Sequence, residues 1–500
     1  MQSRKQSVTG FTIVELLIVI VVIGILAGIT IVAFNGVRQY AGEAVLQADL
    51  RSATTEIEQE WLTEGSYPAN VSDVERSAGT VYEYTGETNY FCITASSENA
   101  QKSFYYGSDD PVIREGVCPG HDGFVDNRQL LFSIGNYHGC ALGDTLYCWG
   151  SNFSGALGDG TASTQSLTPQ PVDLSTGLAG KKITALASAE DSTCVIADNI
   201  PYCWGEYGYT YYGTGTPSSG DARSPVQVSN SGVLAGKTLV AIAAGQATYC
   251  VLDSEGAVYC WGRGPLGDGS TTTSRNPVEV DLTNLGSDVV TKIEAGNNTV
   301  CMVASARAYC WGTSRTGDGT SIQRNIPVAV DTTTGLGSKQ VTDISSSTYS
   351  STCAVADGEG WCWGNDYDGV HGNDSDMGNT TFLSPRPVNM TTSALAGRTI
   401  TQVAAGYIHT CVVADGAGYC FGWNGAGALG NNSTTQSYLA VAVNTSGVLA
   451  GKTITKIDAG EQFSCANSGM ELFCWGSGNS IGIGPSGNIS TPAAVIGFGG

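Results

Sequence analysis

Cysteine is the residue type with the most evident chemistry in this sequence, because its copies follow a repeating pattern. Of the 16 cysteines, seven lie in tetrapeptides similar to Tyr-Cys-Trp-Gly that return about every 50 residues, and each has a second cysteine eight to ten positions upstream. The pairs are Cys140 and Cys148, Cys194 and Cys203, Cys250 and Cys260, Cys301 and Cys310, Cys353 and Cys362, Cys411 and Cys420, and Cys465 and Cys474. Opposite residues of an antiparallel hairpin have Cβ atoms about 4.5–5.5 Å apart, near what a disulfide needs. We therefore expect seven hairpin disulfides.

The remaining two cysteines, Cys92 and Cys118, are expected to form an eighth bridge nearer the N-terminus. Local pairs with no cysteine left over favour an oxidising compartment. The alternative interpretation is a set of paired zinc ligands, but the sequence contains no close Cys-x-x-Cys pair. The pattern therefore predicts structural disulfides, with no metal site and no cofactor.

Other polar residues also recur at fixed places in the repeats. Asp159, Asp268 and Asp318 lie in Gly-Asp-Gly turns. Calcium binding stays open there, but turn formation is the favoured interpretation, because Asp and Gly both suit tight turns. His138 and His409 occupy equivalent places just before the first cysteine of their repeats. We interpret them as packing residues of the repeat rather than as ligands or catalytic bases.

Two repeats carry insertions that distinguish them from the others. The insertion in the second repeat contains Tyr207, Tyr209, Tyr211 and Tyr212, which either form a contact surface at a rim or pack within their own loop. The fifth repeat has an acidic insertion from Asp366 to Asp376 that contains His371. We find no catalytic triad, phosphate loop or carboxylate dyad with the spacing of an enzyme. The sequence therefore predicts a binding protein rather than an enzyme.

A carboxylate also lies inside an apolar segment near the N-terminus. Phe11 to Phe34 is one apolar run, long enough to span a bilayer and interrupted by Glu15 and a few small residues. Arg4 and Lys5 are expected to hold the N-terminus in the cytoplasm, so that the rest of the chain lies outside. Carboxylates in such spans are rare and usually functional. The simpler interpretation is that Glu15 lies near a helix N-terminus, where negative charge is favoured.

The residues Gly10-Phe11-Thr12-Ile13-Val14-Glu15-Leu16 resemble the processing site of type IV prepilins. The resemblance implies that a prepilin peptidase cleaves between Gly10 and Phe11 and that the new amino terminus is methylated. It also implies that Glu15 pairs with the terminal amine of a neighbouring subunit, which sets the register of the filament. The protein is then expected in the inner or cytoplasmic membrane before assembly, and on the pilus or cell surface afterwards.

Each repeat of about 50 residues divides into four short strands. In the third repeat we expect strands at Pro225 to Val228, Leu239 to Ala244, Tyr249 to Leu252 and Ala257 to Trp261. Four strands per unit, without helical periodicity, predict the blades of a seven-bladed β-propeller, and a lone blade cannot bury both of its faces. Because side chains alternate along a strand, the tryptophan after each cysteine is expected to fill the space between neighbouring blades.

The two ends of the repeat region differ from the internal repeats. The first repeat begins at Leu131 to Ile134 without a preceding Pro-Val strand, and the last is followed by an extra strand from Thr491 to Val495. We expect this C-terminal strand to complete the first blade and so to remove the open edges.

The repeats resemble the family of propellers named for the regulator of chromosome condensation. Gly155-Ala156-Leu157-Gly158-Asp159-Gly160 and Pro171-Val172 carry the resemblance in the first repeat. It implies a seven-bladed propeller over about three quarters of the chain, but no single function. The eukaryotic family members are associated with nucleotide exchange on a small GTPase, and bacterial relatives include secreted protein-binding propellers. The paired cysteines depart from the nuclear members and favour an exported protein.

Between the apolar run and the repeats, the sequence predicts a long helix and a small sheet. No proline occurs between Phe11 and Tyr67, so the helix is expected to continue to about Leu62. Positions with near-helical spacing on its second half are Val37, Ala41, Ala44, Ala48, Ile57 and Trp61. Strand-like runs follow at Val81 to Tyr84, Tyr90 to Thr94 and Lys102 to Tyr106. This arrangement resembles the globular head of a pilin or pseudopilin.

These elements predict a mainly β protein with an N-terminal pilin helix and the following domains. We expect a leader at 1–10, a pilin helix at 11–62 with its transmembrane segment at 11–34, a small pilin-like head at 63–120, a linker at 121–130 and the propeller at 131–500. The net charge of −22 disfavours general attraction to nucleic acid.

The function predicted from these features is that of a minor type IV pilin at the cell surface. Its partners would be prepilin peptidase, other pilin subunits and an unknown extracellular protein or glycan that one propeller face recognises. Two alternatives stay open. One is a pseudopilin-like component of a secretion or DNA-uptake system, and the other is an extracellular enzyme built on a propeller.

Overall fold

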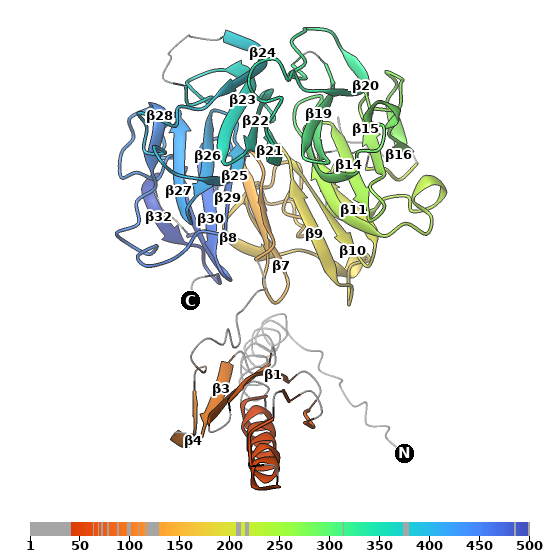
Figure 1. The fold of residues 1–500 in the computed structure, drawn as a ribbon. Coiled ribbons are helices and arrows are strands. Elements are labelled where there is room, and N and C mark those ends of the chain that lie inside the picture. The colour runs from red at the N-terminus through yellow and green to blue at the C-terminus, as the bar shows by residue number, and fades with distance from the viewer. Residues whose placement is uncertain are drawn as a thin grey trace, which may run out of the picture. The chain divides into compact units, whose positions relative to one another are not determined.

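The computed structural model describes residues 42–63, 65–68, 70–71, 74–77, 80–87, 90–97, 102–108, 110–115, 118, 130–206, 212–215, 220–313, 315–373, 380–484 and 487–498. The chain divides into two compact units, Met1–Asn127 and Arg128–Gly500 (Figure 1). The features expected within 1–34, including the cleavage junction and Glu15, lie outside the described residues, as does most of the expected linker at 121–130. In the part of the chain that the structure describes, no helix has the length and apolarity needed to cross a membrane.

The first unit consists of one helix and one sheet in the described residues (Figure 1). The helix covers residues 42–63. The sheet is antiparallel with the strand order β1-β2-β3-β4, and its strands are β1 (Val81–Glu87), β2 (Tyr90–Ser97), β3 (Lys102–Gly107) and β4 (Asp110–Glu115). The three expected strands are present, and β4 is a fourth that the sequence analysis missed. A disulfide between Cys92 and Cys118 fastens β2 to the segment after β4.

The helix packs on this sheet through a stripe that differs from the expected one. Leu46, Leu50, Ala53 and Ile57 are at most 1% exposed and contact buried side chains of β2 and β3. Val37 and Ala41 lie outside the described residues; of the other expected positions only Ile57 belongs to this stripe, whereas Ala44, Ala48 and Trp61 are exposed. The prediction was wrong in phase because small alanines also suit solvent-exposed helix positions, while the larger leucines gain more from burial.

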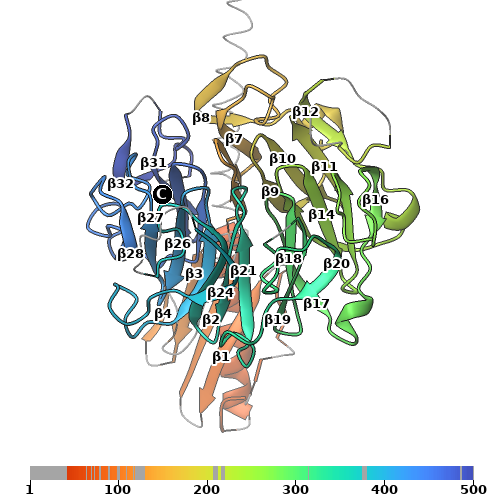
Figure 2. The same ribbon diagram turned by 90° about the horizontal axis from the view of Figure 1, so that it is seen from above.

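Within its described residues, the second unit has seven antiparallel sheets of four strands, each with its strands in chain order (Figure 2). The first strands are β5 (Phe132–Ile134), β9 (Ile183–Ser188), β13 (Leu239–Ala244), β17 (Val290–Ala295), β21 (Val341–Ser346), β25 (Ile400–Ala405) and β29 (Lys456–Ala459). The second strands are β6 (His138–Leu142), β10 (Ser192–Ala197), β14 (Thr248–Asp253), β18 (Thr299–Ala304), β22 (Ser351–Ala356), β26 (His409–Ala414) and β30 (Phe463–Ser468).

The third strands carry the second cysteine of each pair. They are β7 (Leu146–Ser151), β11 (Ile200–Gly205), β15 (Val258–Gly262), β19 (Arg307–Gly312), β23 (Glu359–Asp366), β27 (Ala417–Gly422) and β31 (Glu471–Gly476). The fourth strands are β8 (Gln165–Pro171), β12 (Ala222–Gln227), β16 (Ser274–Glu279), β20 (Arg324–Ala329), β24 (Thr380–Pro387), β28 (Ser437–Ala442) and β32 (Ile489–Ala494). Short 3-10 helices η1 (Leu174–Thr176), η2 (Gly232–Leu234) and η3 (Thr283–Leu285) lie in connections between sheets.

The strand that contains the Pro-Val segment closes each sheet instead of opening the next one. The expected first strand of the third repeat, around Pro225, is β12, which pairs with β11 in the second sheet. Likewise β32 pairs with β31 in the last sheet, so it does not complete the first one. The prediction of strand exchange between the chain ends was therefore wrong. Every sheet is complete within one repeat, because the long connection after the Tyr-Cys-Trp-Gly strand folds back onto that strand.

The seven sheets form a closed series through contacts between their first strands. Contacts run from β5 to β9, β13, β17, β21, β25 and β29 in turn, and β29 contacts β5 again. Figure 2 shows the sheets around a common centre, with β12, β16, β28 and β32 on the outside. The ring therefore closes by packing between complete sheets.

The hairpin disulfides and the tryptophans lie as the sequence predicts. All seven pairs join the second and third strands of a sheet with Cα–Cα distances of 4.1 Å. Trp261, one residue after Cys260, is fully buried against side chains of the preceding sheet. A Cβ added to Gly213, in the connection between β11 and β12, would lie 3.0 Å from the indole nitrogen of Trp261. Glycine is therefore required where each aromatic ring meets the neighbouring loop.

Candidate binding site

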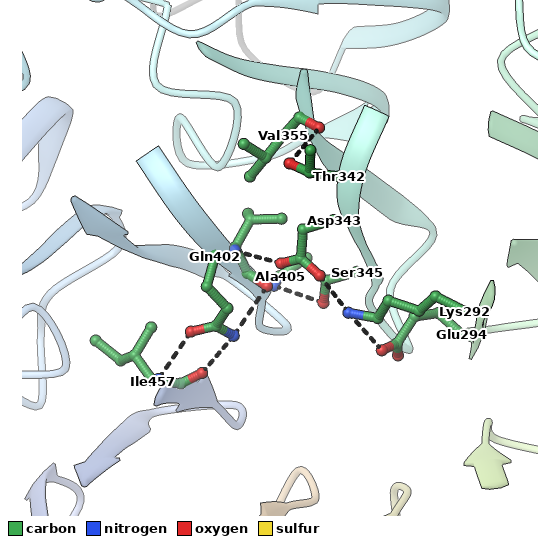
Figure 3. A network of polar contacts seen from close by, with 10 residues as sticks. Lys292, Glu294, Thr342, Asp343, Ser345, Val355, Gln402, Ala405 and Ile457 are labelled. Carbon is green, nitrogen blue, oxygen red and sulfur yellow. Dashed lines mark hydrogen bonds and ion pairs between the residues drawn. The ribbon is translucent and has the colours of Figure 1, made fainter. Parts of the chain in front are cut away.

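Polar side chains bridge the first strands around the centre of the ring (Figure 3). Lys292 Nζ lies 2.5 Å from Asp343 Oδ1 and 3.2 Å from Glu294 Oε1. The second carboxylate oxygen of Asp343 accepts a hydrogen bond from the backbone N–H of Val403 at 2.8 Å. Gln402 continues the series, because its amide exchanges two hydrogen bonds with the backbone of Ile457. Three successive sheet junctions are thus bridged by side chains.

The same chemistry joins the last sheet to the first. Asp458 Oδ2 accepts from the backbone N–H of Ile134 at 3.0 Å, and Lys456 Nζ donates to the carbonyl of Phe132 at 2.5 Å. The backbone N–H of Glu461 also donates to the carbonyl of Asn136 at 3.0 Å. First strands have a ladder partner on one side only, and these side chains satisfy groups on the other side. The network therefore serves the closure of the ring.

Five of these polar residues line a central cavity of ≈ 170 Å³, namely Lys292, Glu294, Gln402, Lys456 and Asp458. Burial raises the pKa of Glu294, and Lys292 offsets part of this effect. Burial alone would lower the pKa of Lys292, but Glu294 and Asp343 outweigh it and raise the pKa. Lys292 is therefore a fixed cation held by two carboxylates. Because these groups are already paired with one another, we assign the network a structural role.

A second candidate site lies on the face formed by the connections between the first and second strands, and between the third and fourth strands, of each sheet. In an antiparallel sheet these connections emerge on the same side. We call it the tyrosine face, because Tyr137, Tyr349, Tyr367 and Tyr407 lie in its connections. The ring centroid of Tyr349 lies 4.3 Å from that of Tyr407 and 4.9 Å from that of Tyr367. Aromatic side chains from two different sheets therefore meet on this face.

The tyrosine face also carries a group of carboxylates. Glu190, Asp191 and Glu461 lie in connections between first and second strands. Burial, followed by repulsion from Glu190 and Asp221, raises the pKa of Asp191 to about 6. None of the ion pairs among the described residues of the second unit involves Glu190, Asp191 or Glu461. This face is therefore a concentration of negative charge beside exposed aromatic rings.

The opposite face has a different charge arrangement. In six of the seven sheets, a lysine or arginine there pairs with a carboxylate of the same sheet or of the connection that leads into it. These pairs are Lys181–Asp198, Lys237–Asp253, Arg307–Asp288, Lys339–Glu359, Arg398–Asp415 and Lys452–Glu471. Each lysine or arginine in these pairs thus offsets a carboxylate on the opposite face, whereas Glu190, Asp191 and Glu461 have no such partner among the described residues, so the tyrosine face is the stronger candidate for binding.

The two repeat histidines are packing residues, as predicted. His138 and His409 are fully buried, and their Nε2 atoms lie 2.8 Å from Thr193 Oγ1 and 2.7 Å from Ser464 Oγ in the next sheet. Burial lowers the pKa of each histidine to about 4. They are therefore neutral hydrogen-bonding groups between sheets at neutral pH. His371 is likewise buried, with its Nδ1 3.8 Å from Asp366.

The turn aspartates accept hydrogen bonds from the backbone of their own turns. The Oδ1 atoms of Asp159, Asp268 and Asp318 accept from backbone N–H groups two residues later, at 2.9 to 3.0 Å. Asp318 also accepts from Arg324 Nε at 2.7 Å. This geometry accounts for these residues as turn formers.

The tyrosine insertion is described only in part. Tyr207, Tyr209 and Tyr211 lie outside the described residues. Tyr212 is 4% exposed, donates from its hydroxyl to the carbonyl of Gly205 and accepts from the N–H of Ala222. The interpretation of Tyr212 as a rim contact was therefore wrong, since the ring fills the core between two sheets.

The residues that sequence reasoning missed are those of the tyrosine face. Tyr137 and Tyr407 lie one or two positions before the two histidines that the pattern singled out. Their place in the repeat was the available signal, because first-to-second strand connections of a ring converge near its axis.

A ring of seven four-stranded sheets, joined by buried aromatics, defines the class of this second unit as a repeat-built β-propeller. The chain carries Regulator of chromosome condensation (RCC1) repeats, matched at residues 144–196 and 239–267. A prokaryotic N-terminal methylation motif matches residues 5–31, which confirms the resemblance to type IV pilins.

Known proteins with similar sequences and structures point the same way. The chain is 30% identical over 345 residues to the human (Homo sapiens) E3 ubiquitin-protein ligase HERC2. The aligned region covers 65% of this chain but only 7% of HERC2. Among solved structures, human WBSCR16 has a TM-score of 0.58 at 18% identity, covering 70% of this chain and 93% of the other. Prp20p from Saccharomyces cerevisiae has a TM-score of 0.55 at 20% identity, with coverages of 72% and 86%. These likenesses show an RCC1-like propeller fold.

Proposed function

We propose that this chain is a minor type IV pilin-like protein that displays a closed, seven-bladed propeller outside the cell for adhesion or for recognition of a protein or glycan. The observation that carries the proposal is the presence, in one chain, of an N-terminal methylation motif and of RCC1 repeats with a disulfide in every sheet. The motif implies a membrane-anchored precursor, and disulfides persist in oxidising surroundings. Export and display account for both features.

In this proposal the N-terminal segment acts in assembly. Prepilin peptidase cleaves before Phe11 and the new terminus is methylated, after which Glu15 pairs with the terminal amine of a neighbouring subunit. The described helix supports packing between subunits, because Ala44 and Ala48 lie on its exposed face. Small side chains allow helices to approach closely.

The propeller is proposed as a recognition module rather than an enzyme. HERC2 is named as a ligase, but this chain spans only 7% of it, so its activity is not carried over. Prp20p is described as binding Gsp1p and histones, which supports protein recognition on this fold. The net charge of −22 supports a partner other than nucleic acid.

The test compares variants in cells that make the filament. Glu15→Val is expected to be processed and inserted normally but to be depleted from filaments, and Gly10→Val to stay unprocessed. Thr12→Val serves as the control, because it changes polarity nearby and keeps the carboxylate. Mass spectrometry of the N-terminus and electron microscopy with a label on the propeller provide the readout.

Three outcomes would contradict the proposal. A mature N-terminus beyond residue 34 would indicate an ordinary signal peptide. Label confined to the cell envelope with normal processing would favour the pseudopilin alternative. Wild-type adhesion by cells whose filaments lack the propeller would remove the recognition role.

A further inference from the structure

A cavity of ≈ 420 Å³ opens on the tyrosine face where the last sheet meets the first. Its lining includes Asn136 and Tyr137 from the first sheet, Asp191 from the second, and Glu461 from the last. Phe153, in the connection after β7, forms part of another wall. The cavity therefore draws its walls from three sheets and exists only in the closed ring.

Two buried polar atoms of this lining lack hydrogen-bond partners. Asn136 is 6% exposed, and its Oδ1 accepts from Thr348 Oγ1 at 2.8 Å, whereas its Nδ2 has no partner. Glu461 Oε1 accepts from Gln462 Nε2 at 3.3 Å, whereas its buried Oε2 has none. Buried polar groups in native proteins are nearly always paired. The wall of the cavity thus contains one unused donor and one unused anionic acceptor, both covered by neighbouring atoms in this structure.

The charges around the cavity are of one sign. Asp191 and Glu461 line it, and Glu190 acts on the charge of Asp191. Burial and then Asp191, Glu190 and Asp221 raise the pKa of Glu206 as well. Several carboxylates therefore repel one another here, and a bound cation would relieve this repulsion.

The aromatic walls suit the same kind of ligand. Phe153 is 70% exposed and Tyr137 is 39% exposed, so both rings offer surface to a bound molecule. Burial, and then the nearby Glu461 carboxylate, raises the pKa of Tyr137. Cations bind favourably over aromatic faces, and arginine also stacks on them.

We propose that this cavity binds an arginine or lysine side chain from a segment of a partner protein. The cationic head contacts the carboxylates of Glu461 and Asp191, and its stem lies along Tyr137 and Phe153. A shift of the Asn136 amide on binding lets Nδ2 donate to a carbonyl oxygen of the same segment. The occupant is a basic peptide segment rather than a sugar because the lining concentrates unneutralised carboxylates. The inference rests on the proposed recognition function and names its partner chemistry.

The experiment measures binding to the full chain in detergent micelles by fluorescence anisotropy. The probes are labelled peptides of alternating glycine with arginine, lysine or glutamate, and a labelled chitotetraose as the glycan probe. The basic peptides are expected to bind and the other two probes to fail. Glu461→Gln and Asp191→Asn are each expected to weaken binding of the arginine peptide about tenfold.

Glu255→Gln is the matched control, because it removes the same charge on the opposite face, where Glu255 pairs with Lys237. It is expected to change affinity less than twofold, while circular dichroism confirms that all variants are folded. Equal losses in all three variants would mean general charge attraction, and unchanged binding in Glu461→Gln or stronger binding of the glycan would overturn the proposal. Filament display with no peptide binding refutes this inference alone, whereas peptide binding without filament display refutes the display proposal alone.

Discussion

The two faces of the seven-sheet unit are built from the same repeats but differ in how their carboxylates are paired. On the opposite face, Asp253 accepts backbone hydrogen bonds from Glu255 and Ala257 at 2.9 Å and lies 3.3 Å from Lys237 Nζ. On the tyrosine face, Asp191 lies among other carboxylates, and its pKa is about 6. Asp253 thus stabilises its own hairpin, whereas Asp191 is the carboxylate that we propose to contact a partner. Charge pairing in six of the seven sheets therefore distinguishes the opposite face from the face that we propose for recognition.

The comparison depends on a common core between the faces, and the largest expected effect comes from breaking it. Trp261→Ala removes a fully buried ring from the junction of two sheets, so the free energy of unfolding should fall by about 3–5 kcal/mol. Phe153→Ala, an exposed aromatic on the tyrosine face, should change it by less than about 0.5 kcal/mol. Chemical denaturation of the full chain in detergent measures both. Comparable losses would mean that the tyrosine face is part of the structural core.

The local repeat chemistry could be predicted from the sequence, whereas the phase of the strands could not. The pairing of Cys250 with Cys260 follows from a short hairpin, and the burial of Trp261 follows from alternation on the same strand. The strand around Pro225 was assigned to the wrong sheet. It lies between two cysteine hairpins in the sequence, and its residues alone do not indicate with which hairpin it pairs. A ring built from repeats looks periodic in either phase.

The candidate site was less predictable than the fold for a related reason. Tyr349 and Tyr407 lie in different repeats and meet only after the ring has formed. The cavity near Asn136 and Glu461 depends on the contact between the last and first sheets, which are separated by more than 300 residues in the sequence. A local sequence motif indicates contacts between residues that are close in the sequence. A site formed where the last sheet meets the first can therefore hardly be predicted from any single repeat.

A smaller expected effect concerns the opposite face. Asp253→Asn keeps the shape of the side chain but removes the charge that binds Lys237, and it turns one acceptor into a donor beside the hydroxyl of Tyr259. Because Asp253 is 2% exposed, we expect a loss of about 1–3 kcal/mol in the free energy of unfolding at pH 7.5. Glu255→Gln, which alters a far more exposed partner of the same lysine, should cost less than about 0.5 kcal/mol. Equal effects of the two would contradict a structural role for the buried carboxylate.

The pH dependence of stability distinguishes the two faces most clearly. The contributions of Asp253 and Asp191 to the free energy of unfolding should change with pH in opposite directions. Burial alone would raise the pKa of Asp253, but the backbone N–H groups of Ala257 and Glu255 outweigh it and lower the pKa. The stability that Asp253 contributes is therefore present above its unfolded pKa, near 3.8, and is lost as pH falls through the lower folded value. For Asp191 the folded pKa of about 6 lies above the unfolded one, so the folded protein holds this proton more tightly. Its contribution is then favourable at low pH and is lost as pH rises from about 4 to about 6.

Asp191→Asn should consequently stabilise the protein at pH 7.5, by about 1–2 kcal/mol once the partial exposure of the carboxylate is considered. At pH 3.5, where the folded protein already carries this proton, the same variant should be nearly neutral. The groups that act on Asp191 are Glu190 and Asp221, with Glu206 and Tyr137 nearby, and all of them are acidic or neutral at pH 7.5. Thermal unfolding of Asp191→Asn and Asp253→Asn at both pH values tests the difference. If Asp191→Asn destabilised the protein at pH 7.5, Asp191 would be a paired structural carboxylate, and the two faces would not differ in the way proposed.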